Sequence, residues 1–221
     1  MIITVDGPAA AGKGTLSSVL AQKYGLAYFD TGMVYRAVGL EMALRGKDLG
    51  NEAEALKVAD NLTFSQMMLL AKHPDFRSAL GGRNASVVSA YPSVRASLLK
   101  MQQDFSKNPV FADGTPANGA IYDGRDTGTV VCPQADIKFF VTASPEVRAE
   151  RRFKEFQAKG AAVTYDEVLA DVKARDERDM NRAVAPMRPA ADAVILDTSH
   201  DTIEDVLRRA VEIIDSRLQN K

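Results

Sequence analysis

The sequence contains few of the side chains that cross-link a chain or hold a structural metal. Among its 221 residues are one cysteine, Cys132, and two histidines, His73 and His200. A single cysteine cannot form an internal disulfide, and these three residues give little basis for a structural zinc site. A lone cysteine is more often a small buried hydrophobic side chain than a nucleophile, so we expect Cys132 to be structural.

Long apolar runs and an excess of one charge are also missing. No run approaches the ~20 apolar residues that span a bilayer. The chain enters a strand-like pattern at Ile2, which leaves no room for a signal peptide. The net charge of −1, from 28 basic and 29 acidic residues, argues against nucleic-acid or membrane binding through a broad positive field. We therefore expect a cytoplasmic protein without either partner.

The chain does have a glycine-rich loop near its start, in MIITVDGPAAAGKGTL. Gly7, Gly12 and Lys13 match the phosphate-binding pattern G-x-x-x-x-G-K, and the loop lies between an apolar strand and an amphipathic helix. Backbone N–H groups of such a loop form an anion-binding nest, and the helix N-terminus adds a partial positive charge. The pattern predicts a nucleotide phosphate site, with Lys13 at the β- and γ-phosphates.

The residue after Lys13 departs from the usual loop, because Gly14 stands where Ser or Thr normally coordinates Mg²⁺. The hydroxyl arrives one residue later, at Thr15, where we expect it to face an α-phosphate. Mg²⁺ retains several water ligands readily. We therefore expect Mg²⁺ to be held mainly by substrate phosphates and water. This loop favours a kinase for a small molecule over a GTPase switch.

Strand-like and helix-like segments alternate along the whole chain, which predicts a mostly parallel sheet with helices on both faces. Two segments ending in Asp-Gly, 110–114 and 120–124, compete for the third strand. Gly81-Gly82 predicts a break, and a helix over 84–105 is expected to be interrupted near Pro92. The other expected strands are 2–5, 26–29, 137–141 and 193–196; the other expected helices include 15–24, 33–45, 52–60 and those beginning after Ser144, Thr164 and Thr202.

A kinase for a phosphorylated acceptor needs a second anion site, and arginine forks suit phosphate. Arg36 lies at the start of an expected helix and Arg125 just past an expected strand end. Arg175, Asp179 and Arg182 are spaced i, i+4, i+7 on another expected helix. The alternative interpretation is a solvated face with an i,i+4 ion pair worth ~0.3–0.5 kcal/mol. The presence of the glycine loop favours the anion site.

Five motifs together resemble the bacterial cytidylate kinases, which belong to the P-loop nucleoside monophosphate kinases. They are DGPAAAGKGTL, DTGMVYRA, AYPSVRASLL, DGRDTGTVV and ARDERDMNRAVAPM, in the family's order and approximate spacing. The resemblance covers nearly the whole chain. It implies a three-layer P-loop fold with a five-stranded parallel sheet, and ATP-dependent phosphorylation of CMP and dCMP with Mg²⁺. A kinase for another acceptor such as UMP, AMP or shikimate remains the alternative.

The resemblance also implies roles for individual residues. Lys13, Arg125 and Arg182 would be catalytic, and Arg36 would join the two arginines at the acceptor phosphate. Asp126 would accept a hydrogen bond from the amino group of cytosine, which uracil lacks. The ATP set is Gly7, Pro8, Ala9, Ala10, Ala11, Gly12, Lys13, Gly14, Thr15, Arg151 and Arg152. The CMP set is Thr31, Tyr35, Arg36, Ser86, Arg95, Arg125, Asp126, Arg175, Asp179 and Arg182, with Arg175 and Asp179 at the sugar and Ser86, Arg95 and Asp126 at the base.

The same resemblance predicts how one kinase domain is divided. The core would comprise 1–32, 96–147 and 163–221, with a monophosphate-binding region at about 33–95 and a mobile lid at about 148–162. The lid would carry Arg148, Arg151, Arg152, Lys154 and Lys159, unless these form only a solvated basic helix. Two departures from the family are a short 62–77 stretch without the usual β-rich insert and a longer connection around 110–118. We expect a monomer.

Overall fold

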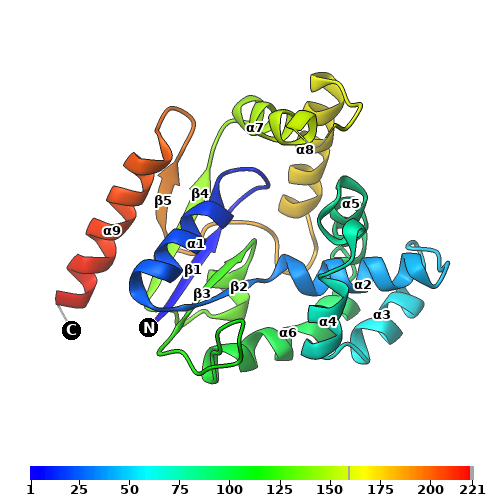
Figure 1. Ribbon diagram of the computed structural model, residues 1–221, viewed down its shortest axis with the longest axis horizontal. Coiled ribbons are helices and arrows are strands. Elements are labelled where there is room, and N and C mark those ends of the chain that lie inside the picture. The colour runs from blue at the N-terminus through cyan, green and yellow to red at the C-terminus, as the bar shows by residue number, and fades with distance from the viewer. Residues whose placement is uncertain (159, 220–221) are drawn as a thin grey trace. The chain divides into compact units, whose positions relative to one another are not determined.

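The computed structural model describes residues 1–158 and 160–219, so the predicted lid residue Lys159 lies outside the described residues. The chain forms two compact units. The first unit comprises residues 1–29 and 109–221, and the second comprises residues 30–108. Each unit is described by itself below, with the elements labelled in Figure 1.

A five-stranded sheet in the order β2-β3-β1-β4-β5 is the framework of the first unit (Figure 1). β1 pairs in parallel with both β3 and β4, and β4 pairs in parallel with β5. In this register Asp6, at the end of β1, is opposite Gly124 at the end of β3. The predicted parallel α/β fold is confirmed. The strands are β1 Ile2–Asp6, β2 Ala27–Asp30, β3 Ala120–Gly124, β4 Ile137–Thr142 and β5 Val194–Asp197.

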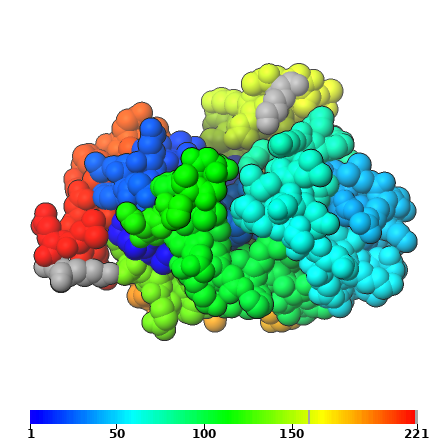
Figure 2. Space-filling view, turned by 60° about the horizontal axis from the view of Figure 1, so that its bottom comes forward, coloured from blue at the N-terminus to red at the C-terminus, as the bar shows by residue number. Residues whose placement is uncertain are grey.

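The helices of the first unit pack on the sheet or on one another. Figures 1 and 2 both show α9 beside α1, and buried side chains of these helices share one apolar core with β1, β4 and β5. α7 packs against α8 through Ala149, Val168 and Val172. The helices are α1 Lys13–Tyr24, α7 Pro145–Ala158, α8 Tyr165–Met180 and α9 Ile203–Gln219, with a π-helical turn at Thr127–Val131.

The second unit is helical, and α2 packs closely against α5. A Cβ on Gly39 of α2 would lie 3.0 Å from the backbone carbon of Asn84, so glycine permits this approach. The 62–77 stretch forms a helix and a 3₁₀ turn, in agreement with the absence of a β pattern. The elements are α2 Gly32–Leu44, α3 Glu52–Asp60, α4 Phe64–Leu70, the 3₁₀ turn Pro74–Arg77, α5 Ala79–Val88 and α6 Pro92–Lys107.

The predicted break at Gly81-Gly82 is wrong, because both glycines lie inside α5. A Cβ on Gly81 would lie only 2.3 Å from the backbone oxygen of Asp75. This glycine therefore serves close packing against the preceding turn and does not end a helix. The interruption near Pro92 is confirmed, since Pro92 begins a separate helix, α6.

The competition between the two Asp-Gly segments is resolved in favour of Ala120–Gly124, which is β3. Val110 forms only an isolated antiparallel bridge with Pro116. Residues 110–118 are thus a connection that turns back on itself before the third strand. None of the helices among the described residues is long and apolar enough to cross a membrane.

Candidate functional site

The glycine loop joins β1 to α1, and its backbone conformation depends on glycine at both ends. Gly7 has a φ of 140°, and a Cβ there would lie 1.9 Å from the backbone oxygen of Val141. Gly12 is the left-handed N-cap residue of α1. Ala10 also has a positive φ, of 60°, although it carries a Cβ. The loop is therefore held in a conformation that few sequences adopt, which is typical of a functional backbone.

Lys13 begins α1 and folds its side chain back over the loop. The side chain is 5% exposed, and Nζ donates a hydrogen bond of 2.7 Å to the Pro8 carbonyl. Burial, and then repulsion from Arg125, lowers the pKa of Lys13 to about 7. Arg175 adds to this repulsion, while Asp123 opposes it. The Lys13 ammonium therefore stands in a positive field that an anion would relieve.

Gly14 faces the end of β3. A Cβ on Gly14 would lie 3.5 Å from Asp123 Oδ2 and 3.7 Å from the Tyr28 hydroxyl. Tyr28 donates a hydrogen bond of 3.2 Å to the same Asp123 oxygen. Two oxygens therefore lie beside the position that a loop hydroxyl usually fills. One carboxylate and one phenol fit a Mg²⁺ ion that phosphates and water mainly hold. The described residues contain no cluster of three or more metal-ligating side chains.

Asp179 gathers three arginines in the first unit. Its carboxylate lies 3.1 Å from Arg125 Nε, 3.9 Å from Arg175 Nε and 3.8 Å from Arg182 Nη1. Burial alone would raise the pKa of Asp179, but the three guanidinium groups outweigh it and hold this pKa below its usual value. The Asp179 carboxylate thus holds three guanidinium groups close together, and guanidinium groups are suited to binding phosphate.

The expectation that Arg182 lies on the same helix as Arg175 is wrong. α8 ends at Met180, and the chain then turns back so that the Met187 N–H donates to the Asp179 carbonyl. Arg182 is held in this turn by a hydrogen bond of 3.0 Å to the Ala185 carbonyl. The turn, and not helical periodicity, brings Arg182 to the carboxylate.

Asp126 lies at the start of the π-helical turn that follows β3. It is 7% exposed, and its backbone carbonyl accepts hydrogen bonds from Val130 and Val131. The next two residues are bonded to Asp6, whose carboxylate accepts from Thr127 and Gly128. The segment that carries Arg125 and Asp126 is thus tied to the residue immediately before the glycine loop.

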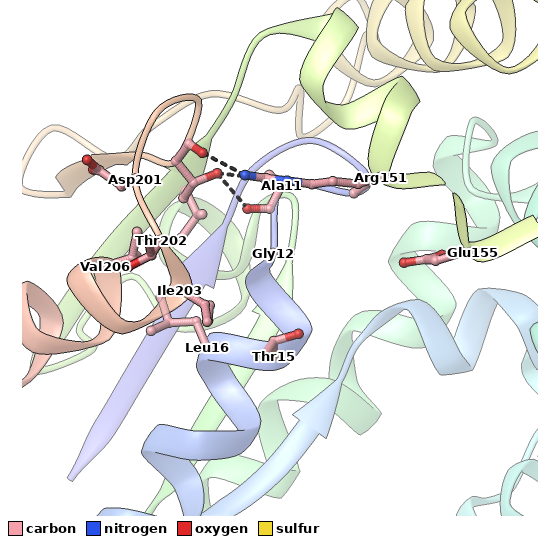
Figure 3. A pocket seen from close by; sticks show the side chains of 13 residues that line it. Ala11, Gly12, Thr15, Leu16, Arg151, Glu155, Asp201, Thr202, Ile203 and Val206 are labelled. Carbon is pink, nitrogen blue, oxygen red and sulfur yellow. Dashed lines mark hydrogen bonds between the residues drawn. The ribbon is translucent and has the colours of Figure 1, made fainter. Parts of the chain in front are cut away.

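A cavity of about 420 Å³ adjoins the glycine loop (Figure 3). Its walls combine loop atoms of Ala11 and Gly12 with Thr15, Arg151 and the start of α9. The Thr198 hydroxyl accepts a hydrogen bond of 2.9 Å from Arg151, and it can donate its proton to the Ala11 carbonyl at 3.2 Å or to the Thr142 carbonyl at 3.1 Å. Arg151 also donates to the Thr198 carbonyl at 2.6 Å. Thr198 therefore joins the loop to α7.

The other basic residues of α7 differ in position. Arg148 is 2% exposed and donates to Asp176 at 3.1 Å and to the Ala9 carbonyl at 3.3 Å. It is an internal bridge from α7 to α8 and to the loop, so it is not one of the exposed cations of a flap. Arg152 stacks over the Phe156 ring at 4.7 Å and pairs with Glu155 at 3.3 Å.

The remaining predicted acceptor residues belong to the second unit. Arg95 is 6% exposed, lies 5.3 Å from the centre of the Tyr35 ring and donates to the Ser89 carbonyl at 3.3 Å. Ser89 in turn donates to the Ser86 carbonyl, which connects Arg95 with α5. Arg36 donates to the Phe76 carbonyl at 3.0 Å. Thr31, Tyr35 and Ser86 are buried.

Sequence reasoning missed four residues of this region: Asp6, Tyr28, Asp176 and Thr198. Asp6 precedes Gly7 in the glycine-loop motif, so it could have been noticed as a charged residue at a buried strand end. Asp176 and Thr198 act through partners 28 and 47 residues away, respectively. No local pattern indicates such pairs.

Comparison with known proteins gives one consistent family. The family model described as cytidylate kinase matches residues 3–216. A cytidylate kinase of Rhodopseudomonas palustris is 48% identical over 216 residues, which cover 98% of this chain and 96% of the relative. A cytidylate kinase of Rhodospirillum rubrum is 49% identical over 222 residues, with 99% of each chain covered. A solved structure from Eubacterium ventriosum, of an uncharacterized protein, shares the fold with a TM-score of 0.52 at 12% identity, covering 98% of each chain.

Proposed function

Because the chain belongs to the cytidylate kinase family, we propose that it transfers the terminal phosphoryl group of ATP to CMP, and to dCMP as a second acceptor. The observation that carries this proposal is the position of Lys13. Its pKa is lowered by burial and by the guanidinium groups of Arg125 and Arg175. A lysine of a phosphate loop next to an arginine cluster suits two phosphate-bearing substrates that meet end to end.

We assign ATP to the glycine loop, with its phosphates on the N–H groups from Gly7 to Thr15. The adenine would enter the cavity of Figure 3, which adjoins the loop and is lined by Leu16, Ile203 and Val206 among others. Arg151 reaches the wall of this cavity. Arg152, on the same helix, would reach the phosphates only if its stacking on Phe156 is broken.

We assign the phosphate of CMP to Arg36, Arg125 and Arg182. Arg175 and Asp179 would contact the sugar, and Thr31 and Tyr35 would line the acceptor site. For the base, Asp126 would accept from the cytosine amino group, while Ser86 and Arg95 would donate to its ring nitrogen and carbonyl. Uracil would place a carbonyl oxygen against the Asp126 carboxylate, which disfavours UMP.

The acceptor phosphate itself is the nucleophile in this reaction. Its second pKa is about 6, as for other phosphate monoesters, so it is mostly dianionic at neutral pH. No general base is needed, and the residues act by alignment and by neutralising charge. Lys13 and the arginines hold the phosphates in line and lower their mutual repulsion. Mg²⁺ bound with ATP would supply further charge neutralisation, with Asp123 and Tyr28 on the side of Gly14.

A kinetic comparison of acceptors tests the proposal. With MgATP, CMP and dCMP should give the highest kcat/KM in an assay of ADP release, well above UMP, AMP, GMP and shikimate. The variant Lys13→Ala should lower kcat by at least about a hundredfold, since it removes a charge aimed at the transferred group. Equal rates with UMP and CMP, or release of ADP without any acceptor, would contradict the proposal.

The division into core, monophosphate-binding region and lid stays a prediction, as do the monomeric state and the cytoplasmic location. A limited-proteolysis experiment with and without both substrates would test the lid. If residues 148–162 close over ATP, the two substrates together should protect this stretch more than either one alone.

A further inference from the structure

The carboxylate of Asp6 is almost fully enclosed. Its hydrogen bonds among the described residues come from one segment of the chain, Thr127 and Gly128. Asp6 is 3% exposed. Oδ1 accepts from the Thr127 N–H at 2.8 Å and from the Thr127 hydroxyl at 2.8 Å, and Oδ2 accepts from the Gly128 N–H at 2.7 Å. Three donors more than one hundred residues away therefore fix both oxygens of this side chain.

The segment approaches Asp6 so closely that it needs glycine. A Cβ on Gly128 would lie 2.8 Å from the Thr4 hydroxyl and 3.3 Å from Asp6 Oδ2. The same residues form part of the π-helical turn Thr127–Val131, an unusual conformation that is frequent at functional sites. The turn is thus shaped by its contacts with β1, and Asp6 supplies the charged ones.

A buried carboxylate is costly to maintain. Burial raises the pKa of Asp6 to about 6 even though the three hydrogen bonds from Thr127 and Gly128 favour its ionised form. Nearby Asp126 raises this pKa further. An apolar residue would leave these three donors unpaired, and an amide would set an N–H₂ group against one of them, so only a carboxylate satisfies all three. The carboxylate of Asp6 therefore holds in place the turn that directly follows Asp126.

We propose that Asp6 is the positioning residue that fixes Asp126 for recognition of the base, and so determines the preference for CMP over UMP. The inference rests on the proposed function, in which Asp126 contacts the cytosine amino group. Asp126 is directly bonded in sequence to Thr127, whose N–H and hydroxyl are both held by Asp6. A shift of this turn moves the Asp126 carboxylate away from its partner.

The expected consequence is selective. Loss of the anchor weakens the hydrogen bond to cytosine and also relieves the repulsion against uracil, so CMP loses more than UMP. Binding of ATP depends on the backbone of the loop after Gly7 and should change little. A merely structural residue would instead lower the activity with both acceptors by the same factor.

The test compares kcat/KM for CMP with kcat/KM for UMP in three variants. Asp6→Asn replaces one acceptor oxygen with an N–H₂ group that must face an N–H donor. Thr127→Val removes only the hydroxyl donor, and Gly128→Ala forces the turn away from Thr4. We expect the CMP-to-UMP ratio to fall at least about tenfold in Asp6→Asn and Gly128→Ala and about two- to fivefold in Thr127→Val. The KM for ATP should stay within about twofold, and Thr127→Ser should retain the ratio.

Two further measurements separate positioning from general damage. In an Asp126→Ala background, Asp6→Asn should lower the ratio no further, because the group that it positions is gone. The matched control Asp215→Asn neutralises a carboxylate that accepts a hydrogen bond of 2.7 Å from the Tyr24 hydroxyl, away from this turn, and should leave the ratio unchanged.

The possible outcomes differ clearly. An unchanged CMP-to-UMP ratio in folded Asp6→Asn, or equal losses for both acceptors in all three variants, would overturn the inference while leaving the proposed function intact. A wild-type enzyme without preference for CMP would overturn both. Should Asp6→Asn not fold, Thr127→Val and Gly128→Ala decide the question, since they disturb the same anchor from its other side.

Discussion

Lys13 Nζ lies between two partners, the Pro8 carbonyl at 2.7 Å and the Asp123 carboxylate at 3.9 Å. The Lys13 side chain is only 5% exposed. One partner is a neutral dipole and the other is distant for an ion pair. Burial and the nearby Arg125 therefore prevail, and the pKa of Lys13 falls to about 7. Without nucleotide, the amine exchanges its proton near neutral pH.

The first prediction is that nucleotide binding takes up a proton at about pH 7.5 to 8. Phosphate oxygens favour the ammonium form and raise the pKa of Lys13 again. Calorimetric titration with ADP in two buffers of different ionisation enthalpy should give different apparent enthalpies. The control is Lys13→Arg, which stays charged, so the difference between wild type and this variant isolates the lysine. Equal proton uptake by the two proteins would refute the prediction.

The lowered pKa of Lys13 also makes the free energy of unfolding depend on pH. Because the folded pKa of Lys13 is below that of an unfolded lysine, the unfolded chain binds more protons between about pH 7 and 10. The contribution of Lys13 to the free energy of unfolding therefore rises with pH across this window. In Lys13→Met this rise should be absent when urea unfolding is compared at pH 7 and pH 9.

The second prediction concerns Gly14. A Cβ there meets Asp123 and Tyr28 only at ordinary contact distances, so Gly14→Ala and Gly14→Ser should both fold. Alanine within a helix should raise the free energy of unfolding by about 0.5 to 1 kcal/mol. Serine would restore a hydroxyl beside Asp123, where it can reach the metal bound with ATP. We expect the Mg²⁺ concentration for half-maximal activity to fall severalfold in Gly14→Ser compared with Gly14→Ala.

The same Mg²⁺ concentration for half-maximal activity in Gly14→Ser and Gly14→Ala would contradict the prediction that a hydroxyl at position 14 reaches the metal. It would mean that the position of the metal is set by phosphates and water so firmly that an added ligand has no effect. Measuring Mn²⁺ binding with ADP by electron paramagnetic resonance would then show whether the serine reaches the ion at all.

Local patterns were enough to predict much of the fold. The glycine loop, the caps at Thr164 and Thr202 and the alternation of strands and helices are determined by neighbours in sequence, and the structure has all of them. Gly81 shows the limit of this reasoning. A glycine pair was interpreted as a break, but the glycine is required by the backbone of Asp75, which only the folded chain brings close.

The candidate site shows the same limit more strongly. Helical spacing predicted that Arg175 and Asp179 share a face, and they do lie 3.9 Å apart. The position of Arg182 depends instead on a turn after the helix, and Arg125 reaches Asp179 across 54 residues. Asp6 belongs to the glycine-loop motif, yet its partners lie 121 and 122 residues away. Residue types identify the chemistry, while long-range contacts decide which side chains meet.

The third prediction concerns Thr198, which connects Arg151 with the glycine loop. Thr198→Val keeps the shape of the side chain but removes its hydroxyl. Arg151 then retains only its bond to the Thr198 carbonyl, so the wall of the cavity in Figure 3 is less well fixed. We expect the KM for ATP to rise about three- to tenfold with the KM for CMP unchanged, and Thr198→Ser to restore it. Steady-state kinetics with each substrate varied in turn measures both KM values. An equal change in the two KM values would contradict this role of Thr198.

The last prediction uses the buried pair of Arg148 and Asp176 to separate stability from function. Both side chains are nearly inaccessible, at 3% and 9% exposure. Removing one partner leaves a buried charge, so Asp176→Leu should lower the free energy of unfolding by about 3 to 5 kcal/mol. The double variant Arg148→Met/Asp176→Leu replaces the pair with apolar groups and should recover most of this loss, as measured by urea unfolding.

Recovery of stability should not bring recovery of activity. In the double variant the Ala9 carbonyl of the glycine loop has lost the hydrogen bond that Arg148 donates at 3.3 Å, and nothing in methionine replaces it. The loop is then less firmly held where ATP phosphates bind, and we expect the KM for ATP to remain about fivefold or more above wild type. If the double variant regains wild-type stability and a wild-type KM for ATP together, Arg148 serves only to join α7 and α8. If stability returns while the KM stays high, the arginine also shapes the phosphate loop, and the two effects of this one side chain are resolved.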